Sequence, residues 1–302
     1  MATRTLEQRL RDAGFRGELR PDEPLARHTT YQIGGPAELL ATPRDRNDLL
    51  GCLAWARAAG VPYRLLGNGS NLLVHDLGVP GVVIRLRKVL DDITREGESL
   101  LCGAGASFPA VANQATEAGL AGLEFATGIP GTVGGAIVMN AGWHEHETGA
   151  VVDWVEAVDV EGRVTTYSAA ECAFGYRTSR FRRTREIILA ARFTLRPQDS
   201  SAIGATVSAF AAARKANQPT AVPSCGSVYL KPDGDFAGRL IEAAGLKGRR
   251  HGGIEVSRLH ANFFINRGGG TCADVQALME EVETAVREQS GVRLEREVEC
   301  WE

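Results

Sequence analysis

Long apolar runs are missing from this sequence. No window approaches the roughly 20 apolar residues that a membrane-spanning helix needs. The first twenty residues alternate charge with leucine and lack the apolar core of a secretory signal. We therefore expect a cytoplasmic protein with no membrane partner.

An excess of positive charge is missing as well. The 302 residues carry a formal net charge of −3, so no basic field favours nucleic acid or an anionic membrane surface. Apolar residues make up 44% of the chain and charged residues 24%, which is ordinary for a globular protein. The composition predicts a globular protein that binds no nucleic acid.

Closely spaced cysteines are also absent. The chain has neither the CxxC spacing of a metal site nor a small disulfide framework, which fits a reducing compartment. The six cysteines are Cys52, Cys102, Cys172, Cys225, Cys272 and Cys300. We interpret five as core or surface thiols, while Cys225 lies inside a candidate functional segment.

The patterns that are present mix helix and strand and predict an α+β chain in three blocks, residues 1–88, 89–199 and 200–302. Caps and apolar spacing predict helices at 5–15, 46–59, 108–119, 200–216, 236–244 and 272–289, with Asp45, Ser107 and Thr271 as N-caps. Apolar or alternating runs predict strands at 36–42, 63–66, 81–86, 99–102, 152–160, 163–167, 186–196, 226–230, 261–266 and 292–299, with a hairpin turn at Glu161-Gly162.

The segment GNGSNLLV (67–74) combines two glycines, two asparagines and a serine in one turn after an apolar run. Glycine removes the Cβ barrier to unusual dihedral angles, so successive backbone N–H groups can converge on an anion. Ser70 and Asn71 add side-chain donors. An anion cradle is one interpretation, and a polar turn between two strands is the other.

A second glycine-rich run, LEFATGIPGTVGGAIVMNAG (123–142), has five glycines among β-branched residues. This mixture favours backbone laid close against a flat apolar ligand, with a helix N-terminus directed at a charged part. A tight helix–helix contact is the alternative. Neither run fits GxGxxG between a strand and a helix, which argues against a Rossmann site.

Two further segments resemble known motifs only in part. WHEHET (143–148) places His144 and His146 two residues apart, but no third ligand is identifiable, and we predict no metal site. NRGGGTCAD (266–274) resembles a phosphate loop yet lacks the Lys-Ser/Thr pair of a P-loop, so we interpret it as a tight strand-to-helix turn.

The order of the motifs resembles one family closely, the UDP-N-acetylenolpyruvoylglucosamine reductases of bacterial wall synthesis. The matching segments are TTYQIGGPA (29–37), LGNGSNLLV (66–74), GIPGTVGGAIVMNAG (128–142), GYRTSRF (175–181), PSCGSVYLKP (223–232), AGRLIEAAGLKG (237–248), HANFFIN (260–266) and LEREV (294–298). They cover nearly the whole chain. The resemblance implies an FAD-binding domain of the vanillyl-alcohol-oxidase type, with subdomains 1–88 and 89–199, and a substrate-binding domain at 200–302.

The resemblance also implies a reaction. NADPH reduces bound FAD, and the reduced flavin delivers a hydride to the enolpyruvyl ether of a UDP-sugar, which gives UDP-N-acetylmuramate for peptidoglycan synthesis. This chemistry needs a cation or an acid to meet charge that spreads into the substrate carboxylate. It also needs a positioned proton donor and groups that bind a diphosphate.

Three residues match the family's catalytic positions. Ser227 matches the proton donor, Arg177 the arginine that holds the substrate carboxylate, and Glu297 the acid near the C-terminus. Glu295 and Glu299 share the predicted strand phase of Glu297, and the family's usual Pro before that glutamate is Arg296 here.

Alternatives exist for each of these three residues. Without the motif, Ser227 is a structural serine, Arg177 a solvated arginine and Glu297 an exposed strand carboxylate. Cys225 lies two residues before Ser227, where strand alternation puts both on the same face, and we interpret it as a neighbour only.

Cofactor and substrate contacts follow from the same resemblance. The FAD-binding residues are Gly67, Asn68, Gly69, Ser70, Asn71, Gly128, Ile129, Gly134 and Gly135. The substrate-binding residues are Tyr176, Arg214 and Lys231. The register of Lys231 is open because many members have Lys-Asn-Pro or Lys-Arg-Pro here, and a solvated helix residue is the alternative for Arg214.

The segment around Glu147 lacks the family's usual Tyr, and the chain is short. Both features resemble the smaller subclass without an extra substrate-clamping loop. Two rival functions stay open, an oxidase of the same fold with covalently tethered FAD and a non-catalytic binding module. Substitution of Gly69 by a β-branched residue is expected to cost flavin occupancy before it costs the fold. The sequence gives no basis for an oligomeric state.

Overall fold

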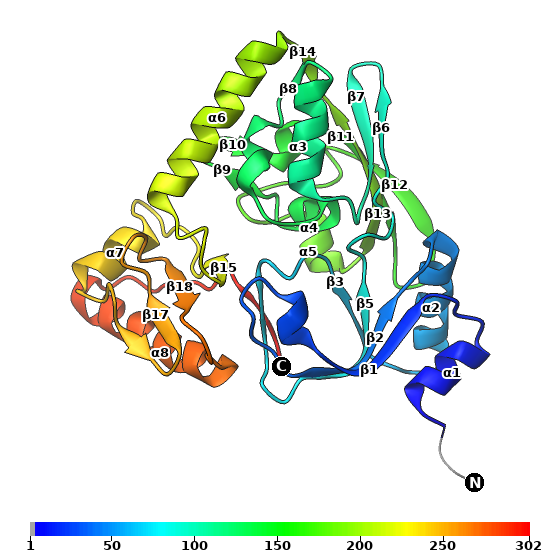
Figure 1. Cartoon of the computed structure of the whole chain (residues 1–302), viewed down its shortest axis with the longest axis horizontal. Helices are drawn as coiled ribbons and strands as arrows, with labels where there is room; N and C mark the ends of the chain where they lie inside the picture. The colour runs from blue at the N-terminus through cyan, green and yellow to red at the C-terminus, as the bar shows by residue number, and fades with distance from the viewer. Residues whose placement is uncertain (1–3) are drawn as a thin grey trace. The chain divides into compact units, whose positions relative to one another are not determined.

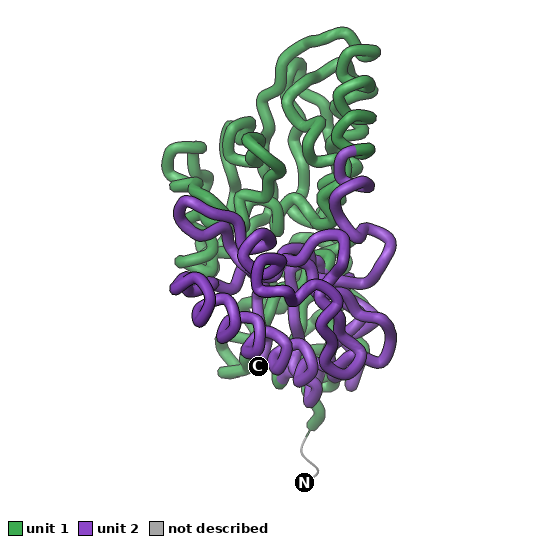
Figure 2. The backbone as a smooth tube through the Cα atoms, turned by 90° about the vertical axis from the view of Figure 1, so that its left-hand side faces the viewer, with its two compact units in different colours: residues 1–21, 39–68, 80–212 green, residues 22–38, 69–79, 213–302 purple. Residues whose placement is uncertain are grey.

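The computed structural model describes residues 4–302 (Figure 1), which form two compact units (Figure 2). Of the described residues, unit 1 holds 4–21, Leu39–Asn68 and Pro80–Ala212. Unit 2 holds Asp22–Glu38, Gly69–Val79 and Ala213–Glu302. Both units are discontinuous in sequence, and one of the points where the chain passes from unit 1 to unit 2 lies inside the loop 67–71.

A four-stranded sheet, most of which belongs to unit 1, has the strand order β1-β2-β5-β3. Its strands are β1 (Glu18–Pro24), β2 (Pro36–Thr42), β3 (Tyr63–Leu66) and β5 (Val79–Arg85), of which β3 and β5 run parallel. Helices α1 (Leu6–Asp12) and α2 (Arg46–Ala58) contribute Leu10, Leu49 and Cys52 to the core beside it. The Asp45 carboxylate accepts the Asp48 N–H and caps α2, as predicted.

Unit 1 also contains an antiparallel sheet of order β12-β11-β13-β7-β6. Its strands are β6 (Ile93–Glu96), β7 (Ser99–Gly103), β11 (Val152–Val158), β12 (Val164–Ser168) and β13 (Ile187–Thr194). The predicted turn at Glu161-Gly162 joins β11 to β12, with Gly162 in the left-handed region at φ +87°. Helices α3 (Phe108–Glu117) and α4 (Val133–Val138) pack against β7, and α4 also packs against β13, which buries Phe108 and Phe193.

The remaining elements of unit 1 are short. They are β8 (Leu120–Ala121), which pairs with β14 (Arg196–Pro197), the pair β9 (Gly142–Trp143) and β10 (His146–Glu147), the 3-10 turns η2 (Glu124–Gly128) and η3 (Thr148–Ala150), and α5 (Arg180–Thr184). The long helix α6 (Ser200–Asn217) starts in unit 1 and ends in unit 2, and Ile203 is its buried residue.

Unit 2 is built on an antiparallel sheet of order β15-β18-β17-β16. The strands of this sheet are β15 (Ser224–Ser227), β16 (Arg250–His251), β17 (Ile254–Val256) and β18 (Phe263–Asn266). The helices of unit 2 include η1 (Leu25–His28), α7 (Ala237–Ala243) and α8 (Cys272–Ser290). Thr271 caps α8 in a capping box, and the predicted apolar face of that helix is buried. Strands β4 (Leu72–Val74) and β19 (Glu299–Trp301) pair in parallel.

Three sequence predictions need correction. The final strand expected at 292–299 is wrong, since the strand is β19 at Glu299–Trp301 and the preceding segment makes only an isolated bridge between Arg296 and Tyr229. Ser107 lies at the N-cap of α3, but its side chain makes no cap hydrogen bond. The strand expected at 226–230 is β15, which spans Ser224–Ser227 and contains a bulge.

Among residues 4–302, no helix is both long enough and apolar enough to span a bilayer.

Candidate active site

The loop 67–71 connects β3 to β4 and has unshared backbone donors. Within the described chain its five N–H groups donate to no protein acceptor, whereas two of its carbonyls do accept hydrogen bonds. The Gly69 carbonyl accepts the Thr30 N–H at 3.1 Å, and the Asn71 carbonyl accepts the Glu299 N–H at 3.1 Å. Gly69 lies in the left-handed region at φ +61°. Successive N–H groups left over in such a conformation are the donors of an anion-binding nest.

The start of this loop contacts the second glycine-rich run. A Cβ on Gly67 would lie 2.7 Å from the Thr132 hydroxyl, which leaves no room for a side chain there. Thr132 is buried and caps α4 by accepting the Gly135 N–H at 3.3 Å. Thr132 is not among the residues predicted from the sequence, although a threonine just before a short apolar helix is an N-cap signal.

The first amides of α4 are already used inside unit 1. Val133 N–H donates to the Ala106 carbonyl at 2.9 Å and Gly134 N–H to the Ala104 carbonyl at 2.8 Å. The expectation of a helix N-terminus directed at a charged ligand is therefore wrong for α4. What Gly135 offers is space, since it is exposed and an added Cβ would meet only the Thr132 hydroxyl, at 3.6 Å.

Near this helix, the Thr127 hydroxyl is a buried polar atom with no hydrogen-bond partner within the described residues. A buried hydroxyl without a partner costs free energy unless a ligand or water meets it. Gly128 and Ile129 follow it and are half-buried. The loop 67–71, the space at Gly135 and the Thr127 hydroxyl each fit a nucleotide cofactor with an anionic diphosphate.

Gly69 requires a correction to the predicted effect of its substitution. A Cβ there would lie 2.4 Å from the His28 carbonyl oxygen and 2.8 Å from the Thr29 Cα, both of which are backbone atoms. Backbone cannot move aside as a flexible side chain can. A β-branched residue at Gly69 will therefore strain the surrounding fold as well as the loop 67–71 itself.

Arg177 lies in a tight turn of unit 1 that precedes α5. The turn is closed by Gly175 N–H to the Thr178 carbonyl at 3.0 Å and by the reverse bond at 3.1 Å. Arg177 has φ +51°, a strained conformation for a non-glycine residue. Its guanidinium donates to the Gly142 carbonyl at 2.9 Å and lies 5.1 Å from the ring centroid of Tyr176, which is about half exposed.

Ser227 and Glu297 lie on neighbouring segments of unit 2. The Glu297 N–H donates to the carbonyl of Val228, the residue after Ser227, at 2.8 Å. The Asn71 side chain donates to the Glu297 carbonyl at 3.1 Å, so the end of the loop 67–71 is hydrogen-bonded to the same two segments. Glu297 is half-buried, whereas Glu295 and Glu299 are exposed, which distinguishes it from the two acids of the same spacing.

Cys225 belongs to the core of unit 2 and not to the surface of these segments. It is 2% exposed, and burial raises the pKa of its thiol to about 12, with the nearby Glu297 adding to the effect. A bulge between Ser224 and Ser227, with Gly226 at φ +83°, interrupts the alternation on which the same-face prediction rested. The interpretation of Cys225 as a structural neighbour stands.

The predicted substrate contacts differ in burial. Lys231 is exposed, and its ammonium lies 4.5 Å from the ring centroid of Phe236. Arg214 is half-buried near the end of α6, and desolvation lowers the pKa of its guanidinium.

The segment WHEHET takes part in aromatic packing. Trp143 and His146 lie 5.2 Å and 5.4 Å from the ring of Phe210 on α6, and His146 also stacks on Phe125 at 5.9 Å. No group of three or more potential metal ligands occurs among residues 4–302.

Most N–H groups of the loop NRGGGTCAD already donate to acceptors within the protein. The Asp76 carboxylate accepts the N–H groups of Cys272 at 2.7 Å and Ala273 at 3.0 Å, and the Asn266 side chain accepts those of Gly268 and Gly270. The first turn of α8 is thus already bound to a negatively charged carboxylate, which takes up its donors and disfavours a phosphate there.

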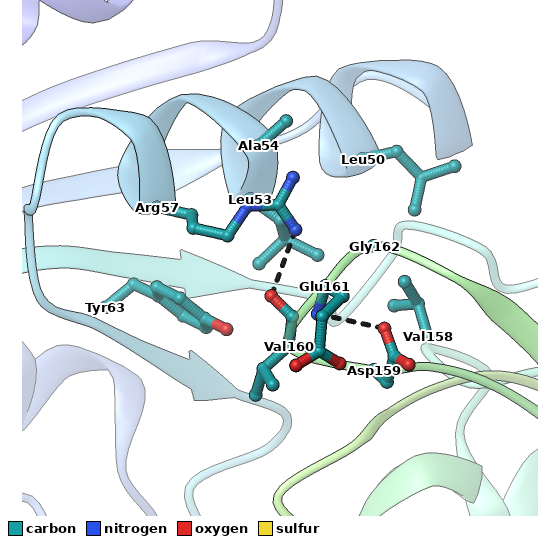
Figure 3. A pocket seen from close by; sticks show the side chains of 10 residues that line it. All are labelled: Leu50, Leu53, Ala54, Arg57, Tyr63, Val158, Asp159, Val160, Glu161 and Gly162. Atoms are coloured by element: carbon teal, nitrogen blue, oxygen red, sulfur yellow. Dashed lines mark hydrogen bonds between the residues drawn. The ribbon is translucent and has the colours of Figure 1, made fainter.

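A pocket of about 250 Å³ lies elsewhere in unit 1, between α2 and the β11–β12 hairpin (Figure 3). Arg57 from α2 donates to the Val160 carbonyl at 3.0 Å across it, and burial raises the pKa of Tyr63 at its side. None of the predicted site residues lines this pocket.

Comparison with known proteins identifies both parts of the chain. Residues 37–168 match the FAD binding domain family, and residues 218–301 match the C-terminal domain of UDP-N-acetylenolpyruvoylglucosamine reductase. The reductase of Heliobacterium modesticaldum is 45% identical, covering 94% of this chain and 91% of its own length. That of Rubrobacter xylanophilus is 47% identical over 92% of this chain and 93% of its own.

Solved structures agree with this result. The UDP-N-acetylenolpyruvylglucosamine reductase of Thermus caldophilus has a TM-score of 0.80 at 36% identity, covering 95% of this chain and 100% of that one. A berberine bridge enzyme variant, described as a reticuline dehydrogenase, has a TM-score of 0.51 at 15% identity over 65% of this chain and 44% of its own, and shares the fold alone.

An FAD-binding domain joined to a reductase C-terminal domain defines an FAD-dependent oxidoreductase. Within that class, the chain belongs to the UDP-N-acetylenolpyruvoylglucosamine reductase family. The predicted family, the α+β fold with a flavin domain of the vanillyl-alcohol-oxidase type, and FAD as cofactor are confirmed.

Proposed function

We propose that this protein catalyses the NADPH-dependent reduction of UDP-N-acetylenolpyruvoylglucosamine to UDP-N-acetylmuramate, a step of peptidoglycan precursor synthesis. The observation that carries this proposal is the cluster in unit 2, where the segment after Ser227, the backbone of Glu297 and the side chain of Asn71 are hydrogen-bonded to one another. FAD held by the residues named below would supply the hydride chemistry between NADPH and the enolpyruvyl group.

The loop 67–71 holds the cofactor diphosphate through its unshared N–H groups, with Ser70 and Asn71 as additional polar side chains. Gly135 contributes by having no side chain, whereas a Cβ on Gly134 would meet the protein's own Ala104 carbonyl oxygen at 3.2 Å. Gly128 and Ile129 line the same glycine-rich run. The absence of charged side chains in the loop fits this mode, because backbone dipoles replace lysines as the anion partners.

Arg177, Ser227 and Glu297 carry the substrate chemistry. Arg177 holds the substrate carboxylate with its planar fork of donors and stabilises the charge that spreads into it. Ser227 gives its hydroxyl proton to the carbon next to the one that receives the hydride. The carboxyl group of Glu297 acts as an acid that hydrogen-bonds the developing enolate.

Tyr176, Arg214 and Lys231 bind the UDP-sugar. The two cations suit a diphosphate, and the desolvation of Arg214 makes its charge more effective than that of a fully solvated residue. A cytoplasmic location and the absence of nucleic-acid and membrane partners stay predictions.

A Ser227→Ala variant tests the proposal through its two half-reactions. Bleaching of the flavin by NADPH, followed by absorbance, is expected to continue at the wild-type rate. Reoxidation of the flavin by the enolpyruvyl substrate is expected to slow by about 100- to 10,000-fold, the usual contribution of a general acid. The matched control is Ser224→Ala in the same strand, which is expected to keep both rates.

Normal turnover by the Ser227→Ala protein contradicts the assigned proton donor. Flavin that stays attached to the denatured chain favours an oxidase with tethered FAD, and wild-type protein that binds flavin without consuming NADPH favours a non-catalytic module.

A further inference from the structure

Asn140, at the end of the second glycine-rich run, is a buried polar hub of unit 1. It is 1% exposed and has φ +42°, a left-handed conformation that asparagine tolerates better than most residues. Its amide oxygen accepts the Gly149 N–H at 2.8 Å. Its amide nitrogen donates to the Glu147 carboxylate at 2.8 Å and to the Gly175 carbonyl at 3.0 Å.

The third of these partners begins the turn that carries Arg177. The Gly175 carbonyl accepts both the Thr178 N–H, which closes the turn, and the Asn140 amide. A carbonyl oxygen has two lone pairs, and here two donors fix it in place. Asn140 therefore holds the first residue of a turn whose third residue, Arg177, has a strained backbone.

The Arg177 side chain is held close to the same point. Its guanidinium donates to the carbonyl of Gly142, two residues after Asn140 in the chain. The backbone of the turn and the head of the side chain are thus both tied to the segment 140–142. A shift of Asn140 moves both anchors, and with them the direction of the guanidinium.

We propose that Asn140 is a positioning residue that sets the orientation of Arg177 toward the substrate carboxylate; this rests on the role of Arg177 in the proposed function. Asparagine meets a specific demand here, because the position needs one acceptor and two donors at a positive φ. An aspartate has the same shape but places an oxygen against the Glu147 carboxylate and the Gly175 carbonyl. A serine has one donor for two acceptors.

The test compares Asn140→Asp with the double variant Asn140→Asp/Glu147→Gln. In the single variant both acceptors lose their donor. In the double variant the amide introduced at position 147 donates to the carboxylate introduced at position 140 and restores that contact, whereas the Gly175 carbonyl still faces an oxygen. The pair therefore separates support of the local fold from support of the Arg177 turn.

For Asn140→Asp we expect flavin reduction by NADPH within about twofold of wild type. The kcat for reduction of the enolpyruvyl substrate is expected to fall by about 10- to 100-fold, because misplacement of a catalytic group by about 1 Å costs rates of that order. In the double variant the thermal midpoint is expected to return toward wild type while this kcat stays low.

The control for stability is Thr148→Val. The Thr148 hydroxyl is fully buried and donates to the Ala141 carbonyl at 2.7 Å, without a hydrogen bond to the Arg177 turn. In the valine variant the backbone N–H of residue 148 still donates to that carbonyl, at 3.0 Å, so the segment 140–142 keeps its position. We expect a lower thermal midpoint with both half-reactions unchanged.

Recovery of kcat together with the thermal midpoint in the double variant would overturn the proposal, because Asn140 would then act on the fold alone. Normal kcat in Asn140→Asp overturns it as well. An Arg177→Ala variant is assayed beside them. If Arg177→Ala is inactive and Asn140→Asp is normal, this inference fails while the role of Arg177 survives, and normal turnover by Arg177→Ala overturns both.

Discussion

Replacing Gly135 by alanine is expected to change the stability of the apoprotein and its flavin affinity in opposite directions. Gly135 is the third residue of α4, and an added Cβ would meet only the Thr132 hydroxyl at 3.6 Å, an ordinary van der Waals distance. Glycine in a helix costs about 0.5–1 kcal/mol relative to alanine because it loses more backbone entropy on folding. The apoprotein should gain that amount, which corresponds to a thermal midpoint about 1–4 °C higher.

Flavin binding should weaken in the same variant. If the cofactor packs on the exposed backbone at Gly135, the new methyl group occupies part of its space, and overpacking of a close contact costs about 1–3 kcal/mol. That range corresponds to an FAD dissociation constant about 5- to 150-fold higher.

The assay uses apoprotein from which the flavin has been stripped. Its thermal midpoint is recorded first, and FAD is then titrated while its fluorescence is followed. A higher midpoint with unchanged flavin affinity would show that the cofactor does not contact Gly135. A lower midpoint would refute the packing argument itself, because nothing in the described chain then accounts for the loss.

Gly69→Ala serves as the contrasting variant. Its Cβ would lie 2.4 Å from the His28 carbonyl, and its backbone is in the left-handed region. We expect the apoprotein to be destabilised in this case, so loss of flavin from Gly69→Ala alone does not diagnose a cofactor contact. Comparing the two variants therefore distinguishes a glycine beside open space, Gly135, from a glycine packed against the protein's own backbone, Gly69.

Further predictions concern four other residues. Arg177→Lys keeps a positive charge but loses the planar fork, and substrate reduction is expected to slow by about 100- to 1,000-fold while flavin reduction by NADPH is unchanged; equal slowing of both would contradict a role at the substrate. Asp76→Ala removes the carboxylate from the first turn of α8 and is expected to cost about 0.5–2 kcal/mol in urea unfolding, with normal flavin occupancy; unchanged stability would contradict its role as a cap. Arg267, and to a lesser degree Arg250, lower the pKa of buried Glu255 below its ordinary 4.5, so the stability from Glu255 is complete above that pH and is lost as the pH falls through the lower folded value. The unfolding free energies of wild type and Glu255→Gln should therefore differ at neutral pH and converge below about pH 4.5; a constant difference down to about pH 2 would refute this. Cys225, with its pKa of about 12 and its burial, is expected to resist thiol reagents in the folded protein, as peptide mass spectrometry can check; labelling at neutral pH would contradict the burial.

Elements whose cause is local were predictable from the sequence. The strands at 36–42 and 63–66 have the predicted bounds, and α8 begins after Thr271 as its capping box indicates. A cap and an apolar face are written in consecutive residues, so no distant partner is needed to find them.

Elements that depend on distant partners in the chain were not predictable from the sequence. Strand β4 exists because β19 pairs with it across more than 200 residues, and neither segment is long enough to give a clear pattern. The segment 292–298 alternates like a strand but bonds mainly through single contacts, such as Leu230 N–H to the Glu295 carbonyl. Alternation of apolar and polar residues predicts an extended backbone, but it does not predict regular hydrogen bonding to a neighbouring strand.

The choice among acids near the C-terminus has the same limit. Spacing alone treats Glu295, Glu297 and Glu299 alike. Burial separates them, because only the middle one is half-buried and has its N–H on the Val228 carbonyl. The family motif pointed to that residue, whereas the physical distinction is a property of the folded unit.

The same reasoning decides which glycine-rich segment is best suited to the cofactor diphosphate. By sequence, the loop 67–71, the start of α4 and the loop before α8 are all plausible anion sites, since each combines glycine with the start of an element. The α4 amides are taken by Ala104 and Ala106, and those of α8 by Asp76. Of these three segments, within residues 4–302, only the loop 67–71 keeps all of its N–H groups unshared. Because a bound anion must find donors that the protein does not already use, the assignment follows from hydrogen-bond satisfaction, which the sequence pattern does not reveal.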